Sequence, residues 1–179
     1  MNENTIRTIS SEMNRYLNNY QMSKLQEVLY RKVEVEKKEI SNEEYVIKYN
    51  ELSAEDFIYL WESVWDEAPS IDQVKLAMEN TLFRVSVIDG EKIIAMARVI
   101  GDKGLSYYIK DVVVLPEYQG KGVGRILINE LLKYVNDNGI KNTDIYVELC
   151  AMPEVAEFYK KCGFDSNDGI RLKMWYEVK

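Results

Sequence analysis

An apolar run followed by closely spaced glycines places the strongest constraint on how this chain can fold. The run is Val112–Leu115, and Gly120, Gly122 and Gly124 follow it just before an amphipathic segment. An apolar run that leads through a proline and glycines into helical spacing predicts a strand, a loop and a helix. Glycines let the backbone approach a ligand closely, and the helix directs free N–H groups at it. We expect this loop to hold an anion, most simply a pyrophosphate.

Two better-known phosphate motifs do not fit the loop. The P-loop requires Ser or Thr directly after Gly-Lys, whereas Gly122 follows Lys121. The dinucleotide fingerprint requires G-x-G-x-x-G in the first strand–helix turn, whereas these glycines are spaced G-x-G-x-G and lie late in the chain.

The loop instead resembles a signature of one enzyme family. Residues Gln119–Gly124 are similar to the Q/R-x-x-G-x-G/A signature of the GNAT N-acyltransferase superfamily, and Phe158–Phe164 resembles its F-Y-x-K-x-G-F element. The resemblance implies an α/β (α+β) GNAT fold, in which helices flank a central mixed, mostly antiparallel sheet. The chain departs from the family at Met152, where many relatives carry an asparagine that helps to hold CoA.

Periodicity and turn residues elsewhere predict elements in the order of that fold. We expect a strand at Tyr45–Ile47, helices from Ser53 to about Trp65 and from Ser70 to about Asn80, two strands in 82–100 joined at Asp89-Gly90, a strand at 105–115, a helix from about Gly122 to Asn136 with Gly139 as a left-handed stop, a strand at 143–149 parallel to 105–115, a helix from Pro153, and a closing strand at 171–178.

Composition restricts the chemistry and the partners. The chain has no histidine and only two cysteines, Cys150 and Cys162, so histidine catalysis is excluded and we expect no metal site. The net charge of −7 makes nucleic acid an unfavourable partner. No apolar stretch is long enough to cross a bilayer and no basic-then-apolar leader opens the chain, so we expect a cytoplasmic protein without membrane contact.

The chain divides into two predicted parts. Residues 1–40 show helical spacing of apolar residues and form a predicted helical N-terminal extension, while 41–179 form the GNAT domain. The extension would pack either on its own domain or on a second subunit, so a homodimer is possible.

The resemblance implies acetyl-CoA as the co-substrate. Loop amides from Gly120 to Arg125 would then hold the pyrophosphate, and the strand backbone would pair with pantetheine like an added strand. The predicted cofactor-binding residues are Val112, Val113, Val114, Gln119, Gly120, Lys121, Gly122, Val123, Gly124 and Arg125.

Acetyl transfer to an amine needs a neutral amine, an N–H for the developing oxyanion and a proton for the departing thiolate. Asp111 is the predicted base, directly or through water, and a structural Asp is an equally open alternative. The backbone N–H of Val113 or Val114 would stabilise the oxyanion. Tyr159 matches the family's tyrosine that protonates the thiolate; the alternative is a core aromatic.

The acceptor is predicted from an aromatic and acidic segment. Trp65, Asp66 and Glu67 follow the first predicted helix, in the helix–loop–helix that forms one wall of the acceptor pocket in GNAT relatives. The spacing of Trp61 and Trp65, four residues apart, favours the alternative that both are simply the buried face of that helix. We expect a small cationic or aromatic primary amine. Two alternatives stay open: a protein or peptide acceptor, and a non-catalytic CoA-binding regulatory domain.

Overall fold

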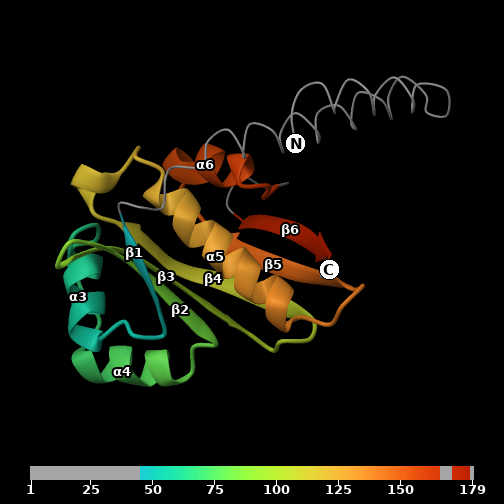
Figure 1. The fold of residues 1–179 in the computed structure, drawn as a ribbon, viewed down its shortest axis with the longest axis horizontal. Coiled ribbons are helices and arrows are strands. Elements are labelled where there is room, and N and C mark those ends of the chain that lie inside the picture. Colours follow the sequence, from blue (N-terminus) through green and yellow to red (C-terminus); the bar gives the residue numbers. More distant parts are fainter. Residues whose placement is uncertain (1–44, 166–170, 178–179) are drawn as a thin grey trace. The chain divides into compact units, whose positions relative to one another are not determined.

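The computed structural model describes residues 45–165 with their side chains, and the backbone of 171–177. The predicted extension at residues 1–40 lies outside the described residues. The described residues form a layered α/β fold (Figure 1).

The described strands form a single six-stranded sheet in the order β1-β2-β3-β4-β5-β6. All neighbouring strands are antiparallel except β4 and β5, which run parallel as predicted. A parallel pair needs a crossover, and α5 supplies it. The strands are β1 Val46–Tyr49, β2 Phe83–Asp89, β3 Lys92–Gly101, β4 Ser106–Val114, β5 Asp144–Cys150 and β6 Arg171–Glu177.

Helices cover the sheet. They are α3 Ala54–Glu62, α4 Ile71–Glu79, α5 Val123–Asn138 and α6 Ala156–Lys161, with short 3₁₀ turns at Pro116–Tyr118 (η1) and Pro153–Val155 (η2). Figure 1 shows α5, in orange, lying across the sheet. Four consecutive residues of β3, Ile94–Ala97, are buried. Successive strand residues point to opposite faces, so β3 is covered on both sides.

Side-chain caps begin α3 and α4 where the sequence predicts them. The Ser53 hydroxyl accepts from the N–H of Asp56 at 3.0 Å, and Ser70 and Gln73 form a reciprocal capping box. The predicted end of α3 near Trp65 is wrong by three residues, because the helix ends at Glu62. There the Ser63 hydroxyl and N–H both donate to the Leu60 carbonyl, at 2.6 Å and 3.3 Å, which tightens the last turn.

The left-handed stop predicted at Gly139 is also wrong. Gly139 has φ −76° and ψ 165°, which is extended backbone. Side chains satisfy the terminal carbonyls of α5 instead: Asn138 Nδ2 donates to Tyr134 O and Lys141 Nζ donates to Asn136 O, each at 2.8 Å. With these bonds in place, the helix ends without a left-handed residue.

A bulge and a divergence of strands shape β4. Between β3 and β4, Met96 pairs with Val113 but Arg98 pairs with Lys110, so β4 carries one extra residue. Asp111 lies in this bulge with φ 51°. Beyond Ile109 the register between β4 and β5 ends, while β5 continues to pair with β6 as far as Cys150. The two central strands therefore separate at residues 110–114.

Candidate active site

A cavity of about 950 Å³ lies where β4 and β5 separate. Its size is at the upper end for small-molecule sites. Four parts of the chain contribute to its wall: β4, the glycine loop, the segment from β5 to α6, and the end of α3. The lining residues that matter below are Trp61, Val64, Trp65, Asp111, Val112, Val113, Val114, Gln119, Gly120, Gly122, Gly124, Arg125, Cys150, Met152, Val155, Phe158 and Tyr159.

The glycine loop has the geometry of an anion site. Gly120 and Gly122 have φ of 74° and 88°, a left-handed conformation that favours glycine. Gly122 is the N-cap of α5 and no side chain caps this end. The N–H groups of Val123 and Gly124 therefore have no partner within the helix, and the helix dipole adds positive potential there. The Val123 side chain is buried, so only its backbone can serve a ligand.

The third glycine, Gly124, is important for the packing of two helices. A Cβ built on Gly124 would lie 3.1 Å from Phe158 Cζ. Gly124 thus lets α5 approach the ring of Phe158 on α6, which itself lines the cavity.

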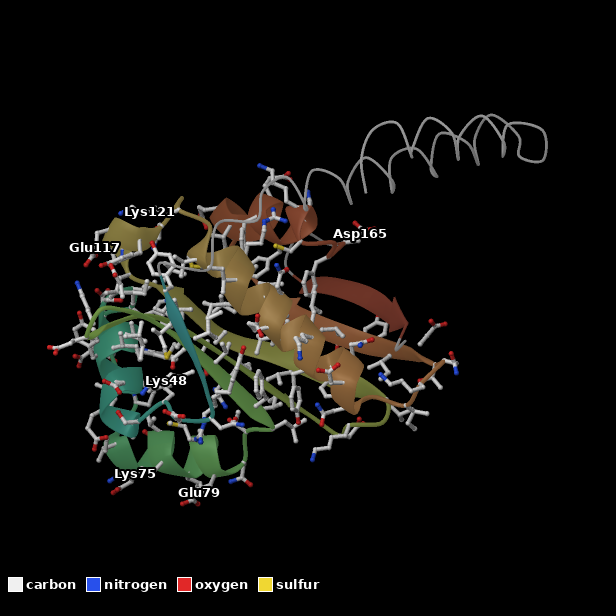
Figure 2. All side chains as sticks on the ribbon, viewed as in Figure 1. Lys48, Lys75, Glu79, Glu117, Lys121 and Asp165 are labelled. Atoms are coloured by element: carbon white, nitrogen blue, oxygen red, sulfur yellow. The ribbon has the colours of Figure 1, made fainter. Side chains whose placement is uncertain are left out.

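The two predicted cations differ in position. Arg125 lines the cavity, and its Nη1 donates to the Lys161 carbonyl at 3.4 Å. Lys121 does not line it: its Nζ lies 5.1 Å from the centroid of the Tyr118 ring. Figure 2 shows Lys121 at the same end of the molecule as Glu117. A hydrogen bond from Lys92 lowers the pKa of Glu117, and Lys121 adds to that effect.

Tyr159 is the predicted acid and lies in the cavity wall with only 8% of its surface exposed. Burial raises the pKa of Tyr159 to about 12, with a smaller contribution from Cys162. Edge-on contacts with Phe158 and Phe164, at centroid distances of 4.9 Å and 6.2 Å, fix the ring. The phenol therefore keeps its proton at neutral pH.

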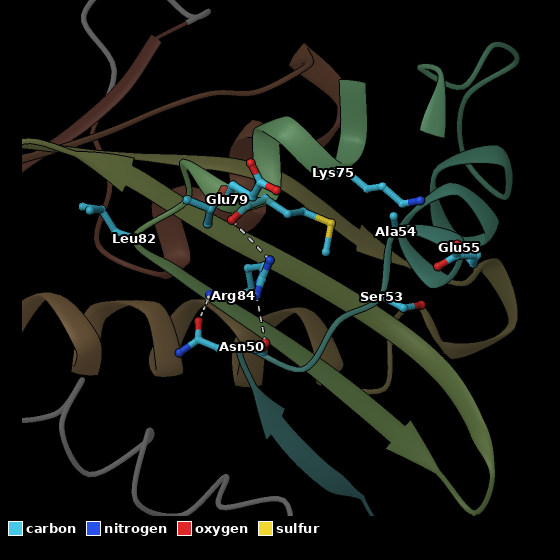
Figure 3. Close-up of a pocket in the computed structure, with 10 residues that line it drawn as sticks. Asn50, Ser53, Ala54, Glu55, Lys75, Glu79, Leu82 and Arg84 are labelled. Carbon is cyan, nitrogen blue, oxygen red and sulfur yellow. Dashed lines mark hydrogen bonds between the residues drawn. The ribbon is translucent and has the colours of Figure 1, made fainter. Parts of the chain in front are cut away.

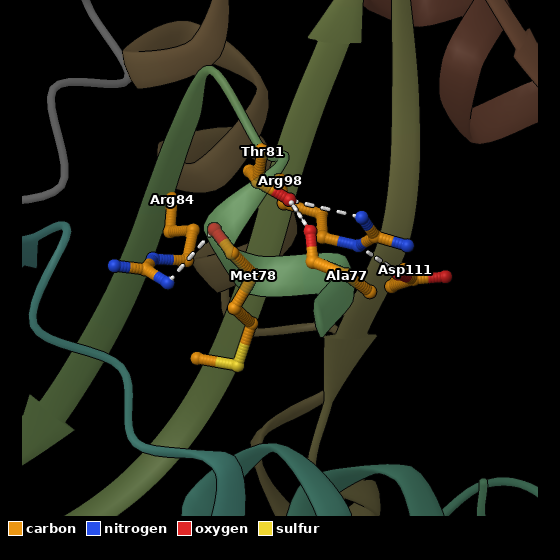
Figure 4. A network of polar contacts seen from close by, with 6 residues as sticks. All are labelled: Ala77, Met78, Thr81, Arg84, Arg98 and Asp111. Atoms are coloured by element: carbon orange, nitrogen blue, oxygen red, sulfur yellow. Dashed lines mark hydrogen bonds and ion pairs between the residues drawn. The ribbon is translucent and has the colours of Figure 1, made fainter. Parts of the chain in front are cut away.

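Asp111 also lines the cavity, but its carboxylate is engaged. Arg98 Nε donates to Asp111 Oδ2 in an ion pair whose side chains are 13% and 8% exposed, respectively. Arg98 Nη1 donates to Thr81 Oγ1 at 3.0 Å, and Thr81 donates to the Ala77 carbonyl of α4 at 2.8 Å (Figure 4). No sequence motif pointed to Arg98. Its position between Ala97 and Val99 in an apolar strand was the available signal, since a buried charge needs a partner.

Only part of the predicted acceptor segment lines the cavity. Trp65 lines the cavity with Trp61 and Val64, and the two indole rings lie 4.4 Å apart. Asp66 and Glu67 are exposed and do not line it. The backbone carbonyl of Glu67 accepts from Trp61 Nε1 at 2.7 Å, which holds the loop against the indole.

A second hollow, of about 600 Å³, lies among β2, α4 and the start of α3. Arg84 crosses it and donates to Asn50 O at 2.9 Å and to Met78 O at 3.2 Å (Figure 3). Burial lowers the pKa of Arg84. Glu55, Lys75 and Glu79 complete a wall of mixed charge, and none of the predicted site residues lies there.

Within the described residues, no cluster of acidic, cysteine or histidine side chains could hold a metal ion. Across the same residues, no helix combines the length and the apolar character that a membrane span requires.

Comparisons with known proteins agree with this architecture. An uncharacterized ycf52-like N-acetyltransferase of Prochlorococcus marinus is 34% identical over 145 residues, covering 76% of this chain and 78% of that protein. The uncharacterized N-acetyltransferase ycf52 of Porphyra purpurea is 28% identical over 167 residues, 90% of each chain. A probable acetyltransferase of meticillin-resistant Staphylococcus aureus, known from a crystal structure, matches with a TM-score of 0.63 and 28% identity over 69% of this chain and 92% of that one.

The family model described as the acetyltransferase (GNAT) family matches residues 43–164, which include the glycine loop, Asp111 and Tyr159. This chain belongs to the GNAT acetyltransferase family.

Proposed function

We propose that the protein transfers an acetyl group from acetyl-CoA to a primary amine, by direct attack in a ternary complex. The observation that carries the proposal is one continuous cavity, with uncapped amides of α5 in one part of its wall and the buried phenol of Tyr159 in another. An anion-binding end and a proton donor are what a CoA thioester and its leaving thiolate require.

The cofactor-binding residues are proposed as follows. The N–H groups at Gly122–Gly124 face the pyrophosphate, with Arg125 as the cation nearest to it and Lys121 acting from outside the cavity. The backbone of Val112–Val114 has no β5 partner and can pair with the pantetheine arm as an added strand. Met152, which is 63% exposed, would offer the arm a thioether instead of an amide.

The backbone alternation of β4 favours Val114 over Val113 as the oxyanion donor. Leu115 N–H donates to Ile94 O of β3 at 2.9 Å. Neighbouring strand residues direct their backbone groups to opposite sides, so Val113 faces β3 and Val114 faces the gap. The Gln119 side chain donates to the Val114 carbonyl at 3.0 Å from that same side.

Acetyl transfer in this site requires two proton movements, one to the departing sulfur and one from the amine. The amine nitrogen bonds to the carbonyl carbon, the carbon–sulfur bond breaks, and Tyr159 donates a proton to the sulfur while the amine loses one. With the pKa of Tyr159 near 12 and that of a thiol near ~8.5, complete transfer is uphill by about 5 kcal/mol. Tyr159 is therefore proposed to share its proton late, as the thiolate departs.

The acceptor is proposed to be a small amine with an apolar or aromatic body. Trp61, Val64 and Trp65 give the cavity an aromatic and aliphatic wall, to which such a body can pack and an ammonium can bind by a cation–π contact. The pairing of Asp111 with Arg98 favours the structural role for Asp111 over the role of base, so that water takes the proton of the amine.

The experiment is a screen of small amines and amino-terminal peptides for release of free CoA thiol. Turnover with aromatic or aliphatic amines and none with peptides is expected. If only peptides release CoA, the small-amine acceptor is wrong. If wild type binds acetyl-CoA but no acceptor gives turnover, the regulatory alternative replaces the enzyme.

A further inference from the structure

We propose that Arg98 and Asp111 form a single positioning unit that fixes the bulge of β4, and that Asp111 does not take the proton of the acceptor. This inference rests on the proposed function, since it assigns a task to two residues of the proposed site. It extends that function by adding Arg98, which does not line the cavity, to the machinery.

The bulge requires an unusual backbone at Asp111. Its φ of 51° lies in the left-handed region, which most L residues avoid and which Asp and Asn tolerate better. The register shift between Met96 and Arg98 shows that the extra residue of β4 is accommodated here. The residues that follow, Val112–Val114, line the cavity. The conformation of Asp111 therefore sets the direction of their backbone groups.

Arg98 is located where it can hold that conformation. It pairs in register with Lys110, one residue before the bulge, and its Nε donates to Asp111 Oδ2. Its Nη1 is tied to Thr81, and Thr81 to the last turn of α4. Figure 4 shows these contacts as one chain from α4 across β3 to β4. Both charged side chains are largely buried, so neither can turn into solvent to find another partner.

The same contacts argue against a base. A proton on the Asp111 carboxylate would remove its charge and so weaken the hydrogen bond that it accepts from Arg98. A general base would weaken this hydrogen bond each time it took up a proton, whereas a positioning residue keeps it at full strength throughout the reaction.

A series of substitutions at Asp111 separates the two roles. Asp111→Asn keeps a hydrogen-bond acceptor and tolerance for positive φ, and should lose less than about tenfold in kcat. Asp111→Gly keeps only the backbone freedom and should lie in between. Asp111→Ala keeps neither and should lose at least about 30-fold. A general base predicts three similar losses of about 10²-fold or more, and that result would overturn the proposal.

Substitution of Arg98 supplies the second arm. Arg98→Met should lower kcat as Asp111→Ala does, and the double variant Arg98→Met, Asp111→Gly should recover activity relative to Arg98→Met, because it removes the stranded carboxylate. Full additivity of the two changes would contradict a single unit. The pH profile of kcat/KM for Asp111→Asn should keep the wild-type shape, and loss of its acidic limb, where a base would become protonated, would instead indicate a base.

Amide chemical shifts keep the test independent of turnover. In labelled protein without substrate, Arg98→Met should move the amide signals of Val112–Val114 more than those of β2, and Asp111→Asn should move them least. Unmoved signals in Arg98→Met would overturn the proposal even if the enzyme is active. Absence of acetyl transfer by wild type would refute the proposed function alone.

Discussion

The side-chain amide of Gln119 donates a 3.0 Å hydrogen bond to the backbone carbonyl of Val114. This bond joins the first residue of the glycine loop signature to the last residue of β4, and both residues line the cavity. It fixes the loop relative to the strand that is proposed to bind pantetheine.

Removing that bond should weaken cofactor binding. Gln119→Ala is expected to raise the Kd for acetyl-CoA by about 3- to 10-fold, since a typical hydrogen bond contributes about 0.5–1.5 kcal/mol. Isothermal titration calorimetry measures the change. Gln73→Ala is the matched control: it removes the capping box of α4, and should lower Tm while the Kd stays unchanged. Equal Kd values for Gln119→Ala and wild type would show that this bond does not contribute to acetyl-CoA binding.

The contact between Gly124 and Phe158 predicts a second effect. In Gly124→Ala the new Cβ would lie 3.1 Å from Phe158 Cζ, so the ring must shift, at a cost of about 1 kcal/mol in the free energy of unfolding. The KM for acetyl-CoA should rise as well, because Phe158 lines the cavity. Adding Phe158→Leu should recover part of the stability in denaturant titrations. If the two substitutions are simply additive, the contact is not the cause.

The raised pKa of Tyr159 predicts an alkaline loss of stability. Between pH 10, near the ordinary phenol pKa of 10.0, and the pKa of about 12 that Tyr159 has in the folded protein, an unfolded chain releases the phenolic proton while the native state retains it. The native state then binds more protons, so its stability falls as pH rises through this window. Wild type should lose about 2–3 kcal/mol more than Tyr159→Phe between pH 10 and 12. Parallel curves for the two proteins would show that the phenol is not buried in this way.

The exposed acids near the cavity predict an effect on rate. Asp66→Asn with Glu67→Gln leaves the bond from Trp61 intact, because only the backbone of Glu67 accepts it. The double variant therefore changes charge alone. For a cationic amine, kcat/KM should fall by about twofold at low salt and by less at high salt, where screening shortens the reach of both charges. A neutral aromatic amine is the control, and equal values for the cationic amine at low salt would exclude acidic steering.

The order of the elements could be predicted because its signals are local. Apolar spacing, the serine caps at Ser53 and Ser70, and the turn after Asp89 each act within a few residues. The left-handed stop predicted after α5 was wrong because the side chains of Asn138 and Lys141 bond to the last carbonyls of the helix. Gly139 can therefore be extended.

The parts of the site that were missed depend on contacts distant in sequence. Arg98, the partner of Asp111, is 13 residues away in the sequence and lies on the neighbouring strand β3. No local sequence pattern identifies it as that partner. The role of Gly124 depends on Phe158, which lies on α6, beyond β5 in the chain. Sequence motifs therefore predict which residues belong to the site, while strand pairing and packing determine what each of them contacts.

The most direct test of the central claim compares two glycines in titrations with acetyl-CoA. Gly122 and Gly90 both have positive φ, 88° and 59°, so valine strains the backbone at each. Gly122 lines the cavity, whereas Gly90 lies in the turn between β2 and β3 and outside the cavity lining.

We predict that Gly122→Val abolishes acetyl-CoA binding by calorimetry while the variant remains folded by circular dichroism, and that Gly90→Val binds as wild type does. Wild-type affinity in Gly122→Val, or an equal loss in both variants, would contradict the assignment of the cavity between β4 and β5 as the acetyl-CoA site.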